Sequence, residues 1–298
     1  MTAASPSPTT AFAVAVFGIA TFSVMDVLMK GLVIAIGVYD AMLWRMLLSV
    51  VPTTAVFLLA RRRWPERAAM KVHATRAAVT AVMAMLFFWG LGRVPLAQGV
   101  ALTYIAPLLS LFLAALLLGE RIGRRTVLAS LLALMGVVTI LSGQLRAELG
   151  GQALVGTAAI LLSAVCYAWN IVLMRQQAMV ADAIEIAFIQ GLLVTLFILP
   201  AAPFLAHVPA AAHWPTLVAA ATLAVLSVYA LGWAYRHAEA SYLSATEYTS
   251  FLWASLFGWW VFHETVSPFT LLGAAMIVGG CLWAARAKAR PEAEALAL

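Results

Sequence analysis

Residues 102–122 read LTYIAPLLSLFLAALLLGERI, and this stretch decides the fold class. From Val94 to Gly119 no side chain carries a charge, and the uncharged run ends at Glu120. About 20 mostly apolar residues in a helix are enough to cross the hydrocarbon core of a bilayer. The stretch therefore predicts a membrane-spanning helix near residues 96–118.

The rest of the chain has the same character. Its 298 residues are 64% apolar and 10% charged, whereas a soluble domain is roughly half apolar and about a quarter charged. In lipid a helix bonds its own backbone groups and can expose apolar side chains on every face. Further apolar runs fall at 11–35, 41–60, 74–91, 126–143, 154–174, 184–206, 216–235, 241–262 and 268–286. We therefore predict an all-α integral membrane protein with ten transmembrane helices.

The two cysteines and the first apolar run add little beyond this architecture. Cys166 and Cys281 both lie inside apolar runs, so they indicate neither a disulfide framework nor a zinc site, and no cofactor is expected. The run that begins near Ala11 lacks the basic start and small-residue cleavage site of a signal peptide. We expect the first helix to remain in the mature protein.

The basic residues predict the orientation, because cytoplasmic loops carry the excess of Lys and Arg. With the N-terminus inside, 14 of the 18 basic residues fall on the cytoplasmic side. They are Arg61, Arg62, Arg63, Arg67, Lys71, Arg76, Arg121, Arg124, Arg125, Arg175, Arg236, Arg286, Lys288 and Arg290. Both termini are expected in the cytoplasm of a bacterial-type inner membrane. The net charge of +6 is explained by this topology, and we expect no nucleic-acid partner.

An internal repeat divides the chain into two halves, residues 1–148 and 149–298. A shift of 144 positions places Tyr104 on Tyr248. Further matches without a gap pair Leu108 with Leu252, Glu120 with Glu264, Thr126 with Thr270 and Gly136 with Gly280. Each half holds five predicted spans, so the halves cross the bilayer in opposite senses, as in the inverted repeats of many secondary transporters. This plan predicts alternating access.

Several stretches together carry a family resemblance. They are VLMKGL at residues 27–32, MLWRMLLS around Arg45, the stretch from Ala97 to Ile122 and its counterpart SATEYTSFLWASLFGWWVFHET. The chain resembles the EamA branch of the drug/metabolite transporter superfamily over nearly its whole length. The resemblance implies two inverted five-helix repeats and export or exchange of small organic solutes, including amino acids in the YddG-type aromatic amino-acid exporters. The second half departs from the first in having Phe251 for Pro107.

Ionisable residues inside spans are costly and are functional candidates for that reason. Asp26 and Lys30 lie four positions apart on one helical face, where they can neutralise each other. Arg45 enters the second span, where its planar guanidinium could hold a carboxylate. Glu247 lies six residues into the ninth span, where burial would make it a proton carrier or an ammonium ligand. Structural ion pairing is the alternative for the first three.

A zwitterionic amino acid needs a cationic partner, an anionic partner and an apolar wall. The predicted substrate-binding residues supply these parts: Lys30, Arg45, Gln98, Tyr104, Trp169, Asn170, Glu247 and Tyr248. Asp26 and Glu247 are the candidates for ion coupling or ion pairing. For each aromatic residue, plain helix packing is the alternative. Glu120 and Glu264 end matching spans and are expected to tie down a neighbouring loop or helix end.

The leading hypothesis is a secondary transporter that exports aromatic or other neutral amino acids and works as a monomer in the bilayer. An importer or exchanger of a nucleotide-like or vitamin-like metabolite is the alternative. An enzyme is disfavoured because the five histidines are scattered, with no metal-ligand spacing. No GxxxxGK[ST] motif is present to bind ATP. A channel is disfavoured because no filter segment recurs.

Overall fold

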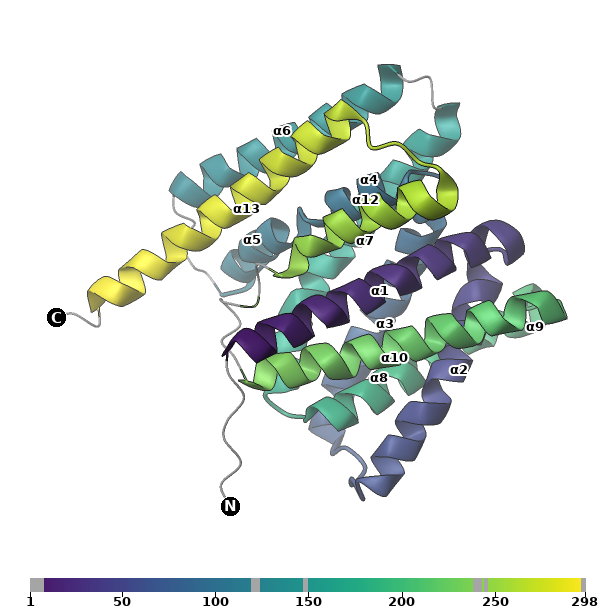
Figure 1. Cartoon of the computed structure of the whole chain (residues 1–298). Helices are drawn as coiled ribbons and strands as arrows, with labels where there is room; N and C mark the ends of the chain where they lie inside the picture. The colour runs from purple at the N-terminus through teal and green to yellow at the C-terminus, as the bar shows by residue number, and fades with distance from the viewer. Residues whose placement is uncertain (1–7, 119–123, 147–149, 238–242, 244–245, 296–298) are drawn as a thin grey trace. The chain divides into compact units, whose positions relative to one another are not determined.

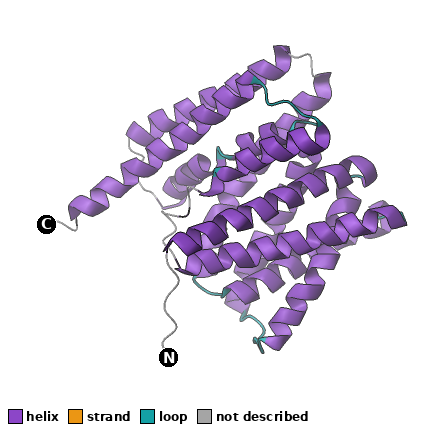
Figure 2. Cartoon of the chain, in the orientation of Figure 1, coloured by secondary structure: helices purple, strands orange, loops and turns teal. Residues whose placement is uncertain are grey.

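The fold is known from a computed structural model that describes residues 8–118, 124–146, 150–237, 243 and 246–295. Helices make up most of this part of the chain, and loops and turns make up the remainder, with no strand among the described residues (Figure 2). The all-α prediction is therefore confirmed. Leu59 is 83% exposed and Val51 is 68% exposed, as suits side chains that face lipid rather than water.

Within the described ranges, six segments are long and apolar enough to cross a membrane. The helices that carry them are α1 (Pro8–Ile36), α2 (Val38–Leu59), α3 (Arg67–Leu91), α7 (Gly150–Ala178), α8 (Ala183–Ile198) with η1 (Leu199–Ala201) and α9 (Ala202–Leu205), and η2 (Ala211–His213) with α10 (Trp214–His237). The other helices are α4 (Leu96–Thr103), α5 (Ala106–Leu118), α6 (Arg124–Arg146), α12 (Thr249–Phe262) and α13 (Pro268–Ala295). Three of the remaining apolar stretches form shorter helices, so the count of ten spans stays a prediction.

The helices form two compact units. Unit 1 comprises Met1–Ala81 and Leu173–His263, and unit 2 comprises Val82–Val172 and Glu264–Leu298. The division falls inside α3 and inside α7. Each unit therefore takes segments from both halves of the sequence. The division of the sequence into two repeats near residue 148 stays a prediction.

Small residues let the helices of unit 1 approach closely. Helix α1 runs beside α10 along its length (Figure 1). At Gly18 an added methyl group would lie 3.0 Å from Leu231 Cγ, and Ser227 Oγ donates a hydrogen bond to the Gly18 carbonyl at 2.7 Å. Ala15 packs against Ala234 nearby. Such small residues at helix contacts are typical of membrane proteins, where close backbone approach supplies the packing energy.

Unit 2 uses the same device between α6 and α13 (Figure 1). A methyl group added at Gly273 would lie 2.5 Å from the carbonyl oxygen of Gly136, and one added at Gly136 would lie 2.6 Å from that of Gly273. Within this unit, Glu264 Oε2 accepts a hydrogen bond from the backbone N–H of Leu96 at 2.7 Å. Leu96 is the first residue of α4, so the prediction that Glu264 ties down a helix end is confirmed. Glu120 lies outside the described residues.

The predicted continuous span at 96–118 is wrong in one respect, because a turn at Tyr104 and Ile105 separates α4 from α5. The physical cause is Pro107, which has no N–H to donate to the Thr103 carbonyl and whose ring crowds it. The amide of Tyr104 instead bonds the nearer Ala101 carbonyl at 3.2 Å.

The matching segment of the second half is interrupted at the same repeat position. Tyr248 is a turn residue before α12, and the Phe251 amide bonds its carbonyl at 3.3 Å. Side-chain hydroxyls take the place of proline here. Thr249 Oγ1 donates to the Thr246 carbonyl and Ser250 Oγ donates to the Glu247 carbonyl, each at 2.6 Å. Such local bonds compete with the helical backbone pattern.

We expect Gly273→Ala to destabilise the protein, because the added methyl group meets a backbone carbonyl that belongs to another helix. Overpacking of this kind costs about 1–3 kcal/mol. The control is Gly279→Ala on the same helix, where nothing lies within 4 Å of the added atom. Thermal unfolding in detergent should show a lower midpoint for Gly273→Ala only. Equal midpoints for the two variants would contradict the close contact.

Candidate functional site

Three charged residues are buried together on the first two helices of unit 1. Asp26 and Lys30 lie on α1 and Arg45 lies on α2, with exposed fractions of 6%, 4% and 6%. The two helices form a hairpin around Gly37, whose φ of 83° suits glycine. In such a hairpin, a residue eight positions after Gly37 lies opposite the residue eight positions before it. Arg45 therefore lies beside the turn of α1 between Asp26 and Lys30. The Asp26 carboxylate and the Arg45 guanidinium interact as opposite charges.

The contacts of this buried group differ from one member to another. Lys30 Nζ lies 5.0 Å from the ring centre of Phe262 on α12, a cation–π contact. Arg45 Nη2 lies 3.6 Å from Met42 Sδ. In the described part of the chain, no donor reaches Asp26 Oδ1. A buried carboxylate oxygen normally accepts a hydrogen bond, so this atom is suited to accept one from water or from a bound solute.

Glu247 and Tyr248 lie at the interruption before α12, also in unit 1. The Tyr235 hydroxyl of α10 donates to Glu247 Oε1 at 3.1 Å. Burial of Glu247 was expected from its depth in the ninth span. The residue keeps an exposed surface next to the helix interruption, while the protein around its carboxylate removes much of that group's contact with water. Its role in solute binding or ion coupling stays a prediction.

The other four predicted residues belong to unit 2. Gln98 is buried on α4, Tyr104 is buried in the turn directly after α4, and Asn170 is buried on α7, whereas Trp169 is 50% exposed. Consecutive residues on a helix point about 100° apart, which is why Asn170 and Trp169 have different surroundings. Gln98 Nε2 has no acceptor among the described residues. The structure thus brings Asp26, Lys30 and Arg45 together in unit 1 and places Gln98 and Tyr104 within two turns of α4.

Four side chains of unit 1, those of Arg76, Gln177, His73 and Glu185, form a hydrogen-bonded series near the α2–α3 connection. This series, called the buried polar chain below, was not predicted. His73 on α3 is fully buried, and its Nε2 lies 3.0 Å from Glu185 Oε1 on α8. Gln177 Nε2 bonds His73 Nδ1, and Arg76 donates to Gln177 Oε1. Because Arg76 can only donate, it fixes the amide oxygen of Gln177, whose NH₂ then donates to Nδ1. His73 is therefore the neutral tautomer that donates from Nε2 to Glu185.

Asp40 is a second buried ionic residue that the sequence reasoning missed. Its Oδ1 accepts from the backbone N–H of His207 at 2.9 Å, and its Oδ2 lies 3.4 Å from His207 Nδ1. Trp44 Nε1 donates to the His207 carbonyl at 2.9 Å, and its ring meets Trp214 edge-on at 5.2 Å. These contacts fasten the segment before α10 to α2. The signal in the sequence was a carboxylate in the first turn of a span.

Metal binding has no support in the described residues, where no group of three His, Cys, Asp or Glu side chains lies close enough to hold an ion. Unit 1 offers two cations and one carboxylate in its buried group and a second carboxylate at Glu247. This arrangement is suited to a solute that carries both signs of charge.

Comparison with known proteins gives consistent relatives. The EamA-like transporter family matches residues 9–142 and again residues 154–286. The pseudopaline exporter CntI of two Pseudomonas aeruginosa strains is 27% identical over 271 residues, which cover 90% of this chain and 93% of the exporter. An uncharacterized transporter of Helicobacter pylori is 27% identical over 224 residues, 72% of each chain. A protein of known crystal structure shares the fold, with a TM-score of 0.62 and 21% identity over 93% of this chain and 98% of that one.

We expect Asp26 and Arg45 to be energetically coupled. Asp26→Asn or Arg45→Gln alone leaves one buried charge without its counterpart and should cost about 3–5 kcal/mol. The double variant should unfold at a higher temperature than either single variant. Thermal unfolding of purified protein in detergent measures this double-mutant cycle.

The matched control is the ion pair between Arg62 and Asp182, which lies at 2.9 Å but is 45% and 41% exposed. The same Asn and Gln replacements there should show a coupling below about 1 kcal/mol. Additive effects of Asp26→Asn and Arg45→Gln would show that the two charges do not depend on each other.

Proposed function

Because the chain belongs to the EamA-like transporter family, within the drug/metabolite transporter superfamily, we propose that it exports small zwitterionic solutes across the inner membrane. It is a multi-pass membrane transporter of small molecules by membership of this family. Amino acids are the proposed substrate class, aromatic and other neutral ones first. The export direction is supported by the similarity to the pseudopaline exporter, which is 27% identical over nearly the full length.

The observation that carries the proposal is the buried group of Asp26, Lys30 and Arg45. Ionisable side chains at such depth are costly and mark solute or ion pathways. Arg45 presents a planar set of donors that matches a carboxylate in two parallel hydrogen bonds. Lys30 adds a second positive charge from the next turn of α1. The α-carboxylate of an amino acid is the natural anion for this pair.

The ammonium end of the solute needs an acceptor. Asp26 Oδ1 is a buried carboxylate oxygen with no donor in the described part of the chain, and Glu247 is a second carboxylate, held by Tyr235. Either can accept from an ammonium group, and Glu247 can also exchange a proton with water. We propose Glu247 for ion coupling and Asp26 as the charge that keeps Arg45 in place.

The interrupted helices support alternating access. Discontinuous helices in secondary transporters place polar backbone groups where the solute binds. In this chain the interruptions occur at Tyr104 and Tyr248, which occupy the same position of the two repeats. Both bring an aromatic ring to an interruption, which favours solutes with an apolar or aromatic side chain. Ten spans in two inverted repeats and activity as a monomer complete the proposal.

The first experiment is counterflow in liposomes that contain the purified protein. Vesicles are loaded with one unlabelled amino acid at a time, and uptake of the labelled compound is followed with and without a pH gradient. Saturable movement of aromatic or neutral amino acids is the expected result. Counterflow of nucleotides or vitamins, without counterflow of any amino acid, would show that amino acids are not the substrate class.

Arg45→Lys should raise the KM for the transported amino acid by roughly tenfold or more, because lysine keeps the charge but loses the forked donors. Arg236→Lys is the control, since Arg236 is exposed in the last turn of α10. Both variants are compared by counterflow at equal protein content. An unchanged KM for Arg45→Lys would show that Arg45 acts only as a point charge.

Glu247→Gln should abolish the response of transport to an imposed pH gradient, because it removes a titratable group with little change in shape. Tyr235→Phe removes only the hydrogen bond to Glu247 and should keep the response while altering KM. Insertion and folding are checked by size-exclusion profiles. A wild-type pH response in Glu247→Gln would exclude Glu247 from ion coupling.

A further inference from the structure

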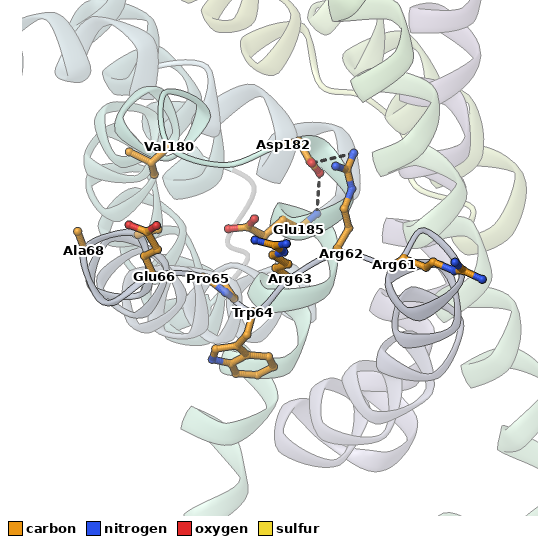
Figure 3. Close-up of a pocket in the computed structure, with 11 residues that line it drawn as sticks. Arg61, Arg62, Arg63, Trp64, Pro65, Glu66, Ala68, Val180, Asp182 and Glu185 are labelled. Atoms are coloured by element: carbon orange, nitrogen blue, oxygen red, sulfur yellow. Dashed lines mark hydrogen bonds and ion pairs between the residues drawn. The ribbon is translucent and has the colours of Figure 1, made fainter.

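A pocket of about 790 Å³ lies in unit 1 between the α2–α3 connection and the connection from α7 to α8 (Figure 3). This volume falls in the range of small-molecule sites, roughly 300–1,000 Å³. Its lining comes from Arg61–Glu66, Ala68 and Ala69 and from three residues around the start of α8, namely Val180, Asp182 and Glu185. The basic cluster in this lining is predicted to face the cytoplasm.

The lining carries equal numbers of opposite charges, three arginines against Glu66, Asp182 and Glu185. Two of the carboxylates already have partners, since Asp182 pairs with Arg62 at 2.9 Å and Glu185 bonds the neutral His73 at 3.0 Å. In the described part of the chain, the side chains of Arg63 and Glu66 make no hydrogen bond or ion pair. Arg63 and Glu66 are therefore a cation and a carboxylate of the pocket that remain available to a ligand.

The positions of these groups are held by the surrounding structure. Asp182 is the N-cap of α8 and accepts from the backbone amides of Ile184 and Glu185, at 2.9 and 3.0 Å. Glu185 is held in place by its hydrogen bond with His73 of the buried polar chain. Figure 3 shows Arg62 reaching across to Asp182, whereas Arg61 extends away from the pocket. The pocket thus has a fixed acidic wall on the α8 side.

Trp64 supplies an apolar wall. Its ring is anchored edge-on to Phe188 at 6.4 Å, and Phe188 packs against Phe57 at 4.5 Å. Trp64 nevertheless remains 61% exposed. A tryptophan that is fixed on one side and open on the other offers a surface for an apolar or aromatic substituent.

We infer that this pocket is a loading site for the exported solute, separate from the buried charges of α1 and α2. The inference rests on the proposed function, since it assigns the same zwitterionic substrate class. Arg63 binds the carboxylate, Glu66 accepts from the ammonium group, and Trp64 packs on the side chain. A purely anionic ligand such as phosphate is disfavoured, because it would meet as many carboxylates as arginines.

The experiment is protection of a cysteine placed in the pocket. Cys166 and Cys281 are replaced by alanine, and Ala68→Cys, an exposed position of the lining, is labelled with a water-soluble maleimide in detergent. Each amino acid of the counterflow panel and inorganic phosphate are tested as protectants. Ala210→Cys, an exposed position before α10, is the control whose labelling should not change.

We expect the transported amino acid to slow labelling at Ala68→Cys at least threefold. Protection should be lost in Arg63→Gln and in Glu66→Gln, and it should persist in the double variant Asp26→Asn/Arg45→Gln, which disables the buried site. Loss of protection in that double variant would show that closure, rather than local binding, shields the cysteine. That result, protection by phosphate alone, or no protection by any amino acid would overturn the loading site.

Transport and loading can fail separately. Counterflow without protection keeps the exporter and removes the loading site. Protection without counterflow keeps the loading site and removes the proposed transport of amino acids.

Discussion

A polar group inside a bilayer must find its partner within the protein, because lipid chains offer none. This constraint explains most of what the helices do with their hydroxyl groups. Ser49 and Thr53 of α2 and Thr195 of α8 each donate to the carbonyl three or four residues earlier. The spans can therefore carry hydroxyls without exposing them. The buried charged residues cannot be satisfied in this local way, and they gather in a few places.

Those places have different chemical characters. Asp40 and His207 fasten one segment to a helix end, and the chain from Arg76 to Glu185 is joined from end to end by hydrogen bonds. The group of Asp26, Lys30 and Arg45 is different, since it leaves a buried carboxylate oxygen without a donor in the described residues. Complete pairing is suited to structure, and incomplete pairing is suited to binding. This contrast is why we propose the α1–α2 group, and not the better-bonded clusters, as the binding site of the solute.

Much of the fold follows from the sequence because length and apolarity alone decide a span. The candidate ionic residues Asp26, Lys30 and Arg45 could be found from the sequence, because each is an ionisable residue in an apolar run. The capping of a helix end by Glu264 was predictable for the same reason. The interruption at Tyr104 was not predicted, although Pro107 signals it. The pairing of His73 with Glu185 could not be predicted, because the partners are 112 residues apart. No sequence pattern in either helix indicates that the two helices lie side by side. The exposed surface of Glu247 was missed because the second interruption has no proline.

The two interruptions differ in their cause. Pro107 has no amide to donate, so the backbone bond to the Thr103 carbonyl is missing between α4 and α5. Phe251 retains its backbone amide. At this interruption the hydroxyl groups of Thr249 and Ser250 form local hydrogen bonds that compete with the regular helical pattern. The two halves of the chain thus interrupt matching segments by different chemistry, a missing amide in the first and competing hydroxyl bonds in the second. A substitution at Pro107 therefore acts on the first interruption alone, and a substitution at Thr249 or Ser250 acts on the second alone.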